Sequence, residues 1–149
     1  MKHLNKYKLE LDFPHCLNIS GGKSSAYMLH KIILANELHK QWPETIKPVF
    51  TNTGLEMEQT YQFLHDIETH WNVPLVWLEM IDKKHGLLYE QVDFQTANRN
   101  GEPFTKLVSD GFLPTPYRRT CTYNLKVLTM KKYMRNTFAQ PYNLSLIHI

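Results

Sequence analysis

The stretch Cys16-Leu17-Asn18-Ile19-Ser20-Gly21-Gly22-Lys23-Ser24-Ser25 decides the fold that this sequence predicts. Its first four residues are typical of a short strand, and helical spacing of apolar residues follows from Ser24 to about Leu38. The paired glycines between them allow a tight turn and leave the backbone open to a ligand, because no Cβ stands in the way. The sequence therefore predicts a loop that joins a first strand to a first helix.

The chemistry of that loop suits an anion. The start of a helix leaves N–H groups without intrahelical acceptors and carries a partial positive charge. The serine hydroxyls add hydrogen-bond donors and the lysine adds a mobile cation. We therefore expect a phosphate cradle formed by Ser20, Gly21, Gly22, Lys23, Ser24 and Ser25. The alternative is a plain glycine turn with a serine N-cap.

The pattern of strands and helices continues after the loop. A second strand is expected at residues 47–51, closed by Asn52-Thr53-Gly54, and helical spacing follows from about Glu58 to Trp71. A third strand is expected at residues 75–78. These strands are apolar without alternation, which favours burial on both faces. The sequence thus predicts an α/β fold, with a Rossmann-like parallel sheet that carries helices on both faces.

The remainder of the chain is less regular. Glycines and prolines interrupt residues 84–116, where we expect an irregular insert that acts as a lid or binding loop. Helical spacing returns from about Asn124 to Arg135.

The last six residues suggest a foreign tail. Residues 144–149 resemble the translation of a transposase adapter used in sequencing libraries. We therefore expect one native domain over residues 1–143 that continues in the natural protein, so that the sheet is incomplete at its carboxyl end. The alternative is that residues 144–149 form a short apolar strand.

Composition narrows the class of protein. The net charge of +3 suits an anionic ligand but does not indicate a nucleic-acid face. Apolar runs fall short of the roughly 20 residues of a membrane helix, and the amino terminus lacks the apolar core of a secretion signal, so we expect a cytoplasmic protein. The clearest local excess of basic residues is formed by Arg118, Arg119, Lys126, Lys131, Lys132 and Arg135. For the last three, a solvated helix flank is an equal interpretation.

Metal centres are not expected from the protein ligands present. The two cysteines, Cys16 and Cys121, cannot supply the four ligands of a structural zinc site or of an ordinary iron–sulfur cluster. His65 and His70 are five residues apart on a predicted helix, whereas a helical zinc pair needs a spacing of four.

Three segments in order carry a family resemblance. The loop at 20–25 fits neither the Walker pattern nor the dinucleotide fingerprint, and it resembles the Ser-Gly-Gly-x-Asp-Ser pyrophosphate loop of the adenine nucleotide alpha-hydrolase (PP-loop) superfamily. Phe50-Thr51-Asn52-Thr53-Gly54, followed by Glu56 and Thr60-Tyr61, is similar to a segment of the phosphoadenosine phosphosulfate reductase-like family. Arg119-Thr120-Cys121-Thr122, followed by Lys126, is similar to a second segment. Gly101-Glu102-Pro103-Phe104 and Leu113-Pro114 further resemble a compact subgroup that is often encoded by phages or mobile elements. The resemblance spans about residues 16–136.

The resemblance implies an enzyme that binds an adenine nucleotide and acts on an adenylyl sulfate by reducing or transferring its sulfur group. Nucleotide contacts are implied for the loop and for Asn52, Thr53, Gly54, Arg119 and Lys126, with Glu56 and Arg118 as further candidates. Cys121 is implied as the attacking thiol, unless a cysteine beyond the present sequence has that role. A thiol-reducing protein such as thioredoxin is the implied partner.

Ser24 departs from the superfamily pattern, so the sequence does not decide between reactions of this superfamily. ATP pyrophosphatases of the superfamily have Asp at this position, where it helps to hold magnesium, and a hydroxyl is a weaker magnesium ligand than a carboxylate. Glu56 or Asp82 could supply a carboxylate instead. Two alternatives therefore stand beside the reductase: an ATP pyrophosphatase-type adenylating enzyme of nucleic-acid sulfur modification, and a nucleotide-binding module without chemistry of its own.

Overall fold

A five-stranded sheet forms the centre of the molecule, in the strand order β4-β3-β2-β1-β5. The computed structural model describes residues 3–145. The strands are β1 (His15–Asn18), β2 (Ile46–Asn52), β3 (Val76–Asp82), β4 (Leu88–Val92) and β5 (Asn143–Ser145). Strands β5, β1, β2 and β3 run parallel, and β4 pairs antiparallel with β3 at the edge.

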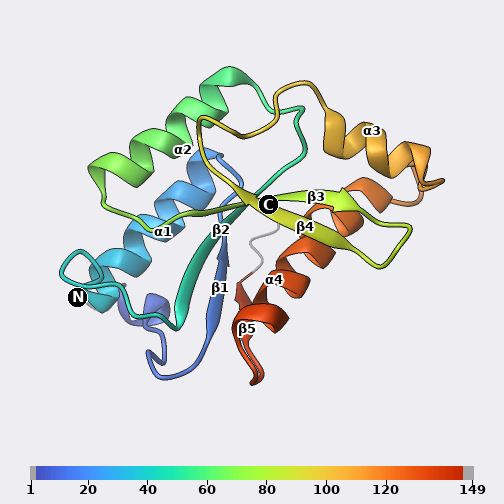
Figure 1. Cartoon of the computed structure of the whole chain (residues 1–149). Coiled ribbons are helices and arrows are strands. Elements are labelled where there is room, and N and C mark those ends of the chain that lie inside the picture. The colour runs from blue at the N-terminus through green and yellow to red at the C-terminus, as the bar shows by residue number, and fades with distance from the viewer. Residues whose placement is uncertain (1–2, 146–149) are drawn as a thin grey trace.

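Helices cover both faces of this sheet, as Figure 1 shows. The helices are η1 (Asn5–Tyr7), α1 (Lys23–Asn36), α2 (Glu58–His70), α3 (Glu102–Ser109), the π-helix η2 (Thr122–Leu128) and α4 (Thr129–Thr137). On one face, α1 and α2 pack on the strands, and on the other face α4 packs on Cys16, Val49 and Leu78. The predicted α/β fold, with a Rossmann-like parallel sheet and helices on both faces, is confirmed except that the edge strand β4 is antiparallel.

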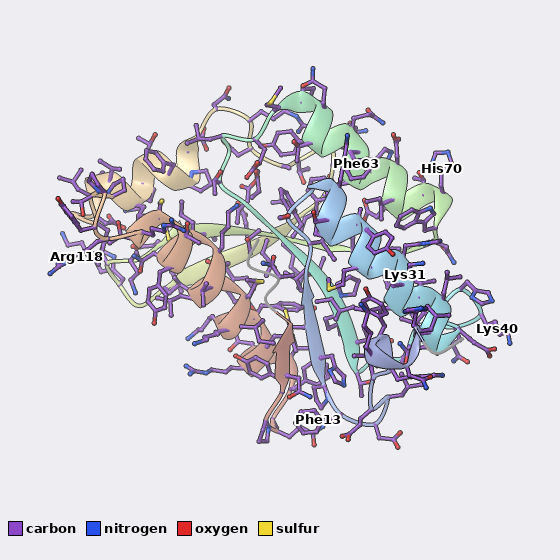
Figure 2. All side chains as sticks on the ribbon, turned by 180° about the vertical axis from the view of Figure 1, so that it is seen from behind. Phe13, Lys31, Lys40, Phe63, His70 and Arg118 are labelled. Atoms are coloured by element: carbon purple, nitrogen blue, oxygen red, sulfur yellow. The ribbon has the colours of Figure 1, made fainter. Side chains whose placement is uncertain are left out.

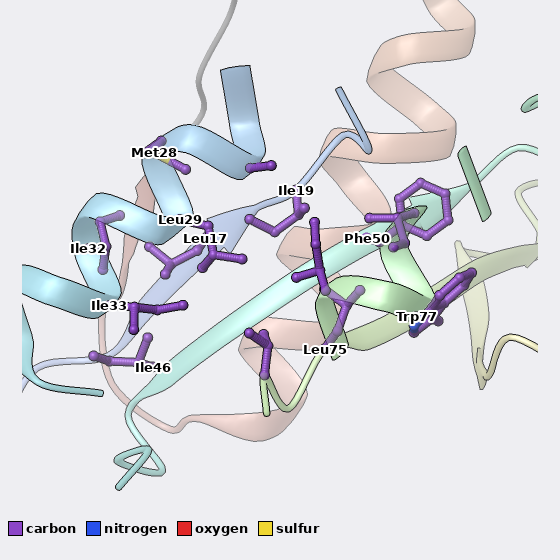
Figure 3. Close-up of a cluster of buried hydrophobic side chains, with 14 of the residues drawn as sticks. Leu17, Ile19, Met28, Leu29, Ile32, Ile33, Ile46, Phe50, Leu75 and Trp77 are labelled. Carbon is purple, nitrogen blue, oxygen red and sulfur yellow. The ribbon is translucent and has the colours of Figure 1, made fainter. Parts of the chain in front are cut away.

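The main core lies between the sheet and the α1–α2 pair. Leu17, Leu29 and Ile46 are among its buried aliphatic side chains, and Phe50 and Trp77 meet edge to face with ring centroids 5.1 Å apart (Figure 3). Burial of these large side chains supplies most of the free energy that holds the helices on the sheet. The core thereby fixes where β1 and β2 end, and both end at the same edge of the sheet.

Residues 84–116 contain more regular structure than the sequence predicts. Strand β4 and helix α3 both lie inside this range, so the expectation of an irregular insert is corrected there. Strand β4 escaped prediction because it is an edge strand whose side chains are all at least partly exposed, and α3 is short and carries a proline in its first turn.

The carboxyl-terminal part differs from the expected helix and tail. The helix expected at 124–135 runs from Thr122 to Thr137, and its first seven residues are π-helical. Asn143–Ser145 pair in parallel with His15–Leu17 of β1 as a fifth strand, in line with the strand interpretation of the tail. Residues 146–149 lie outside the described part, and the foreign origin of 144–149 stays a prediction.

None of the helices described between residues 3 and 145 is both long and apolar enough to span a membrane.

Candidate functional site

The predicted phosphate loop leaves β1 at the carboxyl edge of the sheet. The N–H of Ile19 donates to the carbonyl of Val49 (2.8 Å), so the chain enters the loop beside the end of β2. Gly21 has a φ of +79°, and a Cβ built there would lie 2.5 Å from Cγ2 of Thr60. The first turns of α2 therefore pack directly on the loop, and only glycine fits between them.

Hydrogen bonds within the loop give its serines different roles. Oγ of Ser25 donates to the carbonyl of Gly22 (2.9 Å) and accepts from the N–H of Ser20 (3.3 Å) and from its hydroxyl (3.2 Å). Ser25 is buried, so it closes the loop rather than facing solvent. Lys23 and Ser24 are exposed and remain accessible to a ligand.

The backbone of the loop presents donors at the start of α1. Gly22 is the N-cap residue and has no side chain to cap the helix. The first hydrogen bond of the helix runs from the N–H of Ala26 to the carbonyl of Gly22 (3.1 Å). The N–H groups of Lys23, Ser24 and Ser25 precede it and, with the positive end of the helix dipole, suit a phosphate oxygen. A hollow of about 230 Å³ adjoins this point and is lined by Gly21, Lys23, Gln59, Thr60 and Phe63.

Asn52 lies at the end of β2 and is fully buried. Its Nδ2 donates to Oε1 of Glu79 (2.6 Å) and to the carbonyl of Asn98 (2.7 Å). Its Oδ1 accepts from the N–H of Gly54 (3.0 Å) and from the hydroxyl of Tyr61 (2.8 Å). Burial raises the pKa of Tyr61, which keeps this hydroxyl protonated as a donor. All hydrogen-bonding capacity of the Asn52 amide is thus used inside the protein, and Asn52 shapes the loop after β2 instead of facing a ligand.

Glu79 and Asn98 hold the loop after β2 in place, and the sequence interpretation missed both. Glu79 is 5% exposed, and its Oε1 also accepts from the N–H of Asn98 (2.6 Å). The sequence did contain a signal for Glu79, since its carboxylate lies inside the apolar stretch Val76-Trp77-Leu78-Glu79-Met80. A charged group buried in such a stretch needs hydrogen-bond partners. Its partner Asn98 gave no local signal.

Part of the 84–116 insert is docked on the loop after β2. The N–H of Gly101 donates to the carbonyl of Gly54 (3.0 Å), and a Cβ on Gly54 would lie 2.8 Å from the backbone of Gly101. The guanidinium of Arg99 lies over the ring of Tyr61 (4.5 Å) and donates to Oε2 of Glu58 (2.9 Å). Residues 98–101 are therefore held in place, and a lid role for the insert stays a prediction.

A second hollow, of about 220 Å³, brings the Cys121 segment to the loop after β2. It is lined by Thr53, Leu55, Phe104, Cys121, Thr122, Leu125 and Lys126. Nζ of Lys126 lies 3.5 Å from Oε1 of Glu56, so two predicted site residues form an ion pair at its rim. Cys121 is partly exposed here, whereas Cys16 is buried, and burial raises the pKa of Cys16 to about 12.

Three candidates lie apart from these hollows. Arg118 and Arg119 are exposed and line neither of them. Oδ2 of Asp82 is hydrogen-bonded to Nδ1 of His85 (2.7 Å). This hydrogen bond is the main reason that the pKa of Asp82 falls to about 2. Among residues 3–145, no group of three or more His, Cys, Asp or Glu side chains is arranged so that it could hold a metal ion.

Comparison with known proteins finds a relative from a phage. The chain is 28% identical over 130 residues to the uncharacterized nin region protein ORF290 of Escherichia phage lambda. The match covers 83% of this chain and 43% of that protein, so the chain spans less than half the length of this relative. No family model matches the chain, and no solved structure matches it.

Proposed function

We propose that this protein binds an adenine nucleotide through the loop 20–25 and acts on an adenylyl sulfate, as the resemblance to phosphoadenosine phosphosulfate reductases implies. The observation that carries the proposal is the loop itself. Its backbone donors at Lys23, Ser24 and Ser25 open at the carboxyl edge of a parallel sheet, where strand order turns from β2 on one side of β1 to β5 on the other. Open α/β sheets bind ligands at such a switch point.

The second hollow supports a role in the chemistry for the Cys121 segment. A nucleotide whose phosphate lies on the loop would extend past Thr53 towards Lys126, whose ammonium suits a further oxyanion. In this proposal the Cys121 thiolate attacks the sulfate sulfur, the bond from sulfur to the phosphate oxygen breaks, and the nucleotide leaves. The sulfonate is then carried on the Cys121 sulfur. A dithiol of a thiol-reducing partner such as thioredoxin attacks this sulfur, sulfite leaves with the electron pair of the S–S bond, and the second thiol of the partner frees Cys121 as the partner is oxidised to a disulfide. Arg119 and Arg118 would contribute after a movement of their segment.

The ATP-dependent alternative is favoured by one observation. Glu56 is held beside the second hollow by Lys126, so a carboxylate is available near the loop although residue 24 is serine. Magnesium prefers such oxygen ligands together with phosphate oxygens. A nucleotide-binding module without chemistry is the remaining alternative, since Cys121 is a single partly exposed thiol.

We propose that a phage or mobile element encodes this protein and that it acts in the cytoplasm of a bacterial host. The relative from phage lambda supports a phage setting. A reducing compartment would keep Cys16 and Cys121 as the free thiols that the structure contains.

Calorimetric titration separates the reductase from the ATP-dependent alternative. Phosphoadenosine phosphosulfate, its desulfated product and ATP are titrated into the protein, with and without magnesium. The reductase proposal predicts magnesium-independent binding of the first two, and sulfite release in the presence of thioredoxin that Cys121→Ser abolishes. Binding of ATP alone, with a requirement for magnesium, would favour the adenylating enzyme. Failure of every adenine nucleotide to bind would refute the proposal.

A further inference from the structure

Charge is strongly segregated along this chain. The eleven basic and fourteen acidic residues up to Asp110 give that part a formal charge of −3. After Asp110 there are six Lys and Arg residues and not one Asp or Glu, so this part carries +6. The modest net charge of +3 is therefore the sum of an acidic larger part and a basic carboxyl-terminal quarter. Such an asymmetry makes the basic part a candidate for binding a polyanion.

Four of these six cations are exposed on the outer side of the η2–α4 helix and on the turn before it. Lys126 instead pairs with Glu56 at the second hollow. The helix buries Leu125, Met130 and Met134 against the sheet and α3. Tyr123, Lys132 and Arg135 are exposed on its other side. With Tyr117, Arg118 and Arg119 they form a surface that we call the basic face, and Figure 2 shows Arg118 at the opposite end of the molecule from Lys40.

The cations of the basic face are free to meet a ligand. In the part of the chain that the structure describes, Arg118, Arg119, Lys132 and Arg135 take part in no ion pair. Elsewhere Lys40, Lys47, Arg99 and Lys106 each pair with a carboxylate. A solvated flank would tolerate such charges, but their lack of acidic neighbours leaves a positive potential that is not neutralised within the protein.

Exposed aromatic rings lie among these cations. Tyr117 is 97% exposed and Tyr123 is 51% exposed. The 115–118 turn is closed by reciprocal backbone hydrogen bonds between Thr115 and Arg118 (both 3.1 Å) and by a bond from the Arg118 N–H to Oγ1 of Thr115 (3.0 Å). Tyr117 is thus held in a tight turn with its ring in solvent. A planar group that stacks on this ring would not have to order the backbone of residues 115–118.

We infer that the basic face binds single-stranded nucleic acid. Arginine and lysine track the phosphates of such a strand, and exposed tyrosines stack on its bases. The face spans about 20 Å along the helix, enough for several nucleotides. An acidic protein would match the charge but would leave the two exposed tyrosines without a stacking partner. Arg118 and Arg119 are shared with the proposed nucleotide site, but Tyr117, Lys132 and Arg135, the positions at which the inference is tested, line neither hollow and have no role in that proposal.

Fluorescence anisotropy with a labelled oligothymidylate of about 20 nucleotides tests the inference. We expect binding that weakens as salt rises, and weaker binding of a duplex of equal length. Lys132→Gln with Arg135→Gln should lower the slope of log affinity against log salt by about 1.4, since each lost contact to a single strand contributes about 0.7. Tyr117→Ala should weaken binding about tenfold through lost stacking.

A matched double variant provides the control. Lys8→Gln with Lys31→Gln removes the same charge from the amino-terminal side of the molecule, and Figure 2 shows Lys31 far from Arg118. It should leave the salt slope unchanged. The inference is overturned if this control weakens binding as much as the basic-face variant does. It is also overturned if polyglutamate binds as tightly as the oligonucleotide and Tyr117→Ala affects neither, or if the oligonucleotide fails to bind at low salt.

Discussion

The side-chain amide of Asn52 and the carboxylate of Glu79 are joined by a hydrogen bond of 2.6 Å in the buried layer between β2 and β3. This contact orients Asn52 so that its Oδ1 receives the N–H of Gly54 (3.0 Å). The same carboxylate oxygen receives the N–H of Asn98 (2.6 Å). One buried acceptor therefore fixes both the loop after β2 and the segment that docks on it.

Replacement of Glu79 tests this arrangement. Glu79→Leu removes the acceptor of two N–H groups, one on the Asn52 amide and one on the Asn98 backbone, and should lower the free energy of unfolding by about 3 kcal/mol. Glu79→Gln keeps an acceptor at Oε1 and should cost about 1 kcal/mol or less. Urea unfolding followed by circular dichroism measures both, with Glu90→Gln on the neighbouring edge strand as the control. Equal losses for Leu and Gln at position 79 would show that charge, rather than the acceptor, holds the network.

Gly21 should tolerate substitution much less than Gly22. Gly21→Ala places a Cβ at a φ of +79° and 2.5 Å from Thr60, whereas a Cβ on Gly22 meets only Oγ of Ser20 at 3.6 Å. We expect Gly21→Ala to destabilise the fold by about 2 kcal/mol and Gly22→Ala by much less. Thr60→Ser removes the clashing methyl group, so it should restore part of the loss in Gly21→Ala. No restoration in the double variant would mean that the contact does not carry the effect.

The two cysteines should differ in reactivity. Burial raises the pKa of Cys16 to about 12, so near pH 8 only about one molecule in ten thousand carries the Cys16 thiolate. Cys121 is partly exposed and should react with Ellman's reagent in the folded protein. Cys121→Ser should remove the reaction, and Cys16→Ser should leave it intact. A rapidly reacting thiol in folded Cys121→Ser protein would contradict the packing of β1.

The ion pair between Lys126 and Glu56 should control nucleotide affinity. Both side chains are partly exposed, so Glu56→Gln should change stability by less than about 1 kcal/mol. It removes a negative charge beside the second hollow and frees Lys126, so we expect magnesium-free nucleotide binding to tighten by about threefold. Lys126→Met should weaken it by about tenfold.

Glu44→Gln is the control for the Glu56 variant, because Glu44 pairs with Lys47 elsewhere on the surface. Calorimetry gives the affinities. A loss of ATP affinity in Glu56→Gln that is seen only with magnesium would instead favour the adenylating enzyme.

The order of elements from β1 to β3 could be predicted because each element shows its own pattern in a short stretch of sequence. Apolar runs of strand length alternate with helical spacing, and the Gly21-Gly22 pair marks the turn between them. Strand β4 could not be predicted, since an exposed edge strand lacks an apolar run. The π-helical start of η2 also has no periodicity by which a sequence would reveal it.

The candidate site was only partly predictable for a related reason. Lys126 and Glu56 were identified from motif positions, and the structure brings them together. The internal role of Asn52 depends on partners 27 and 46 residues further along the chain, and such pairings are set by the fold rather than by local sequence.

Binding of an adenine nucleotide phosphate by the loop 20–25 can be observed residue by residue in a titration followed by nuclear magnetic resonance. Nitrogen–proton correlation spectra are recorded as the desulfated product of phosphoadenosine phosphosulfate is added to the uniformly labelled protein. We expect saturable shifts that are largest at the backbone amides of Gly22, Lys23, Ser24 and Ser25, with Asn72 at the opposite end of α2 unchanged. Saturation of binding without movement of those four amides, or an absence of binding, would contradict it.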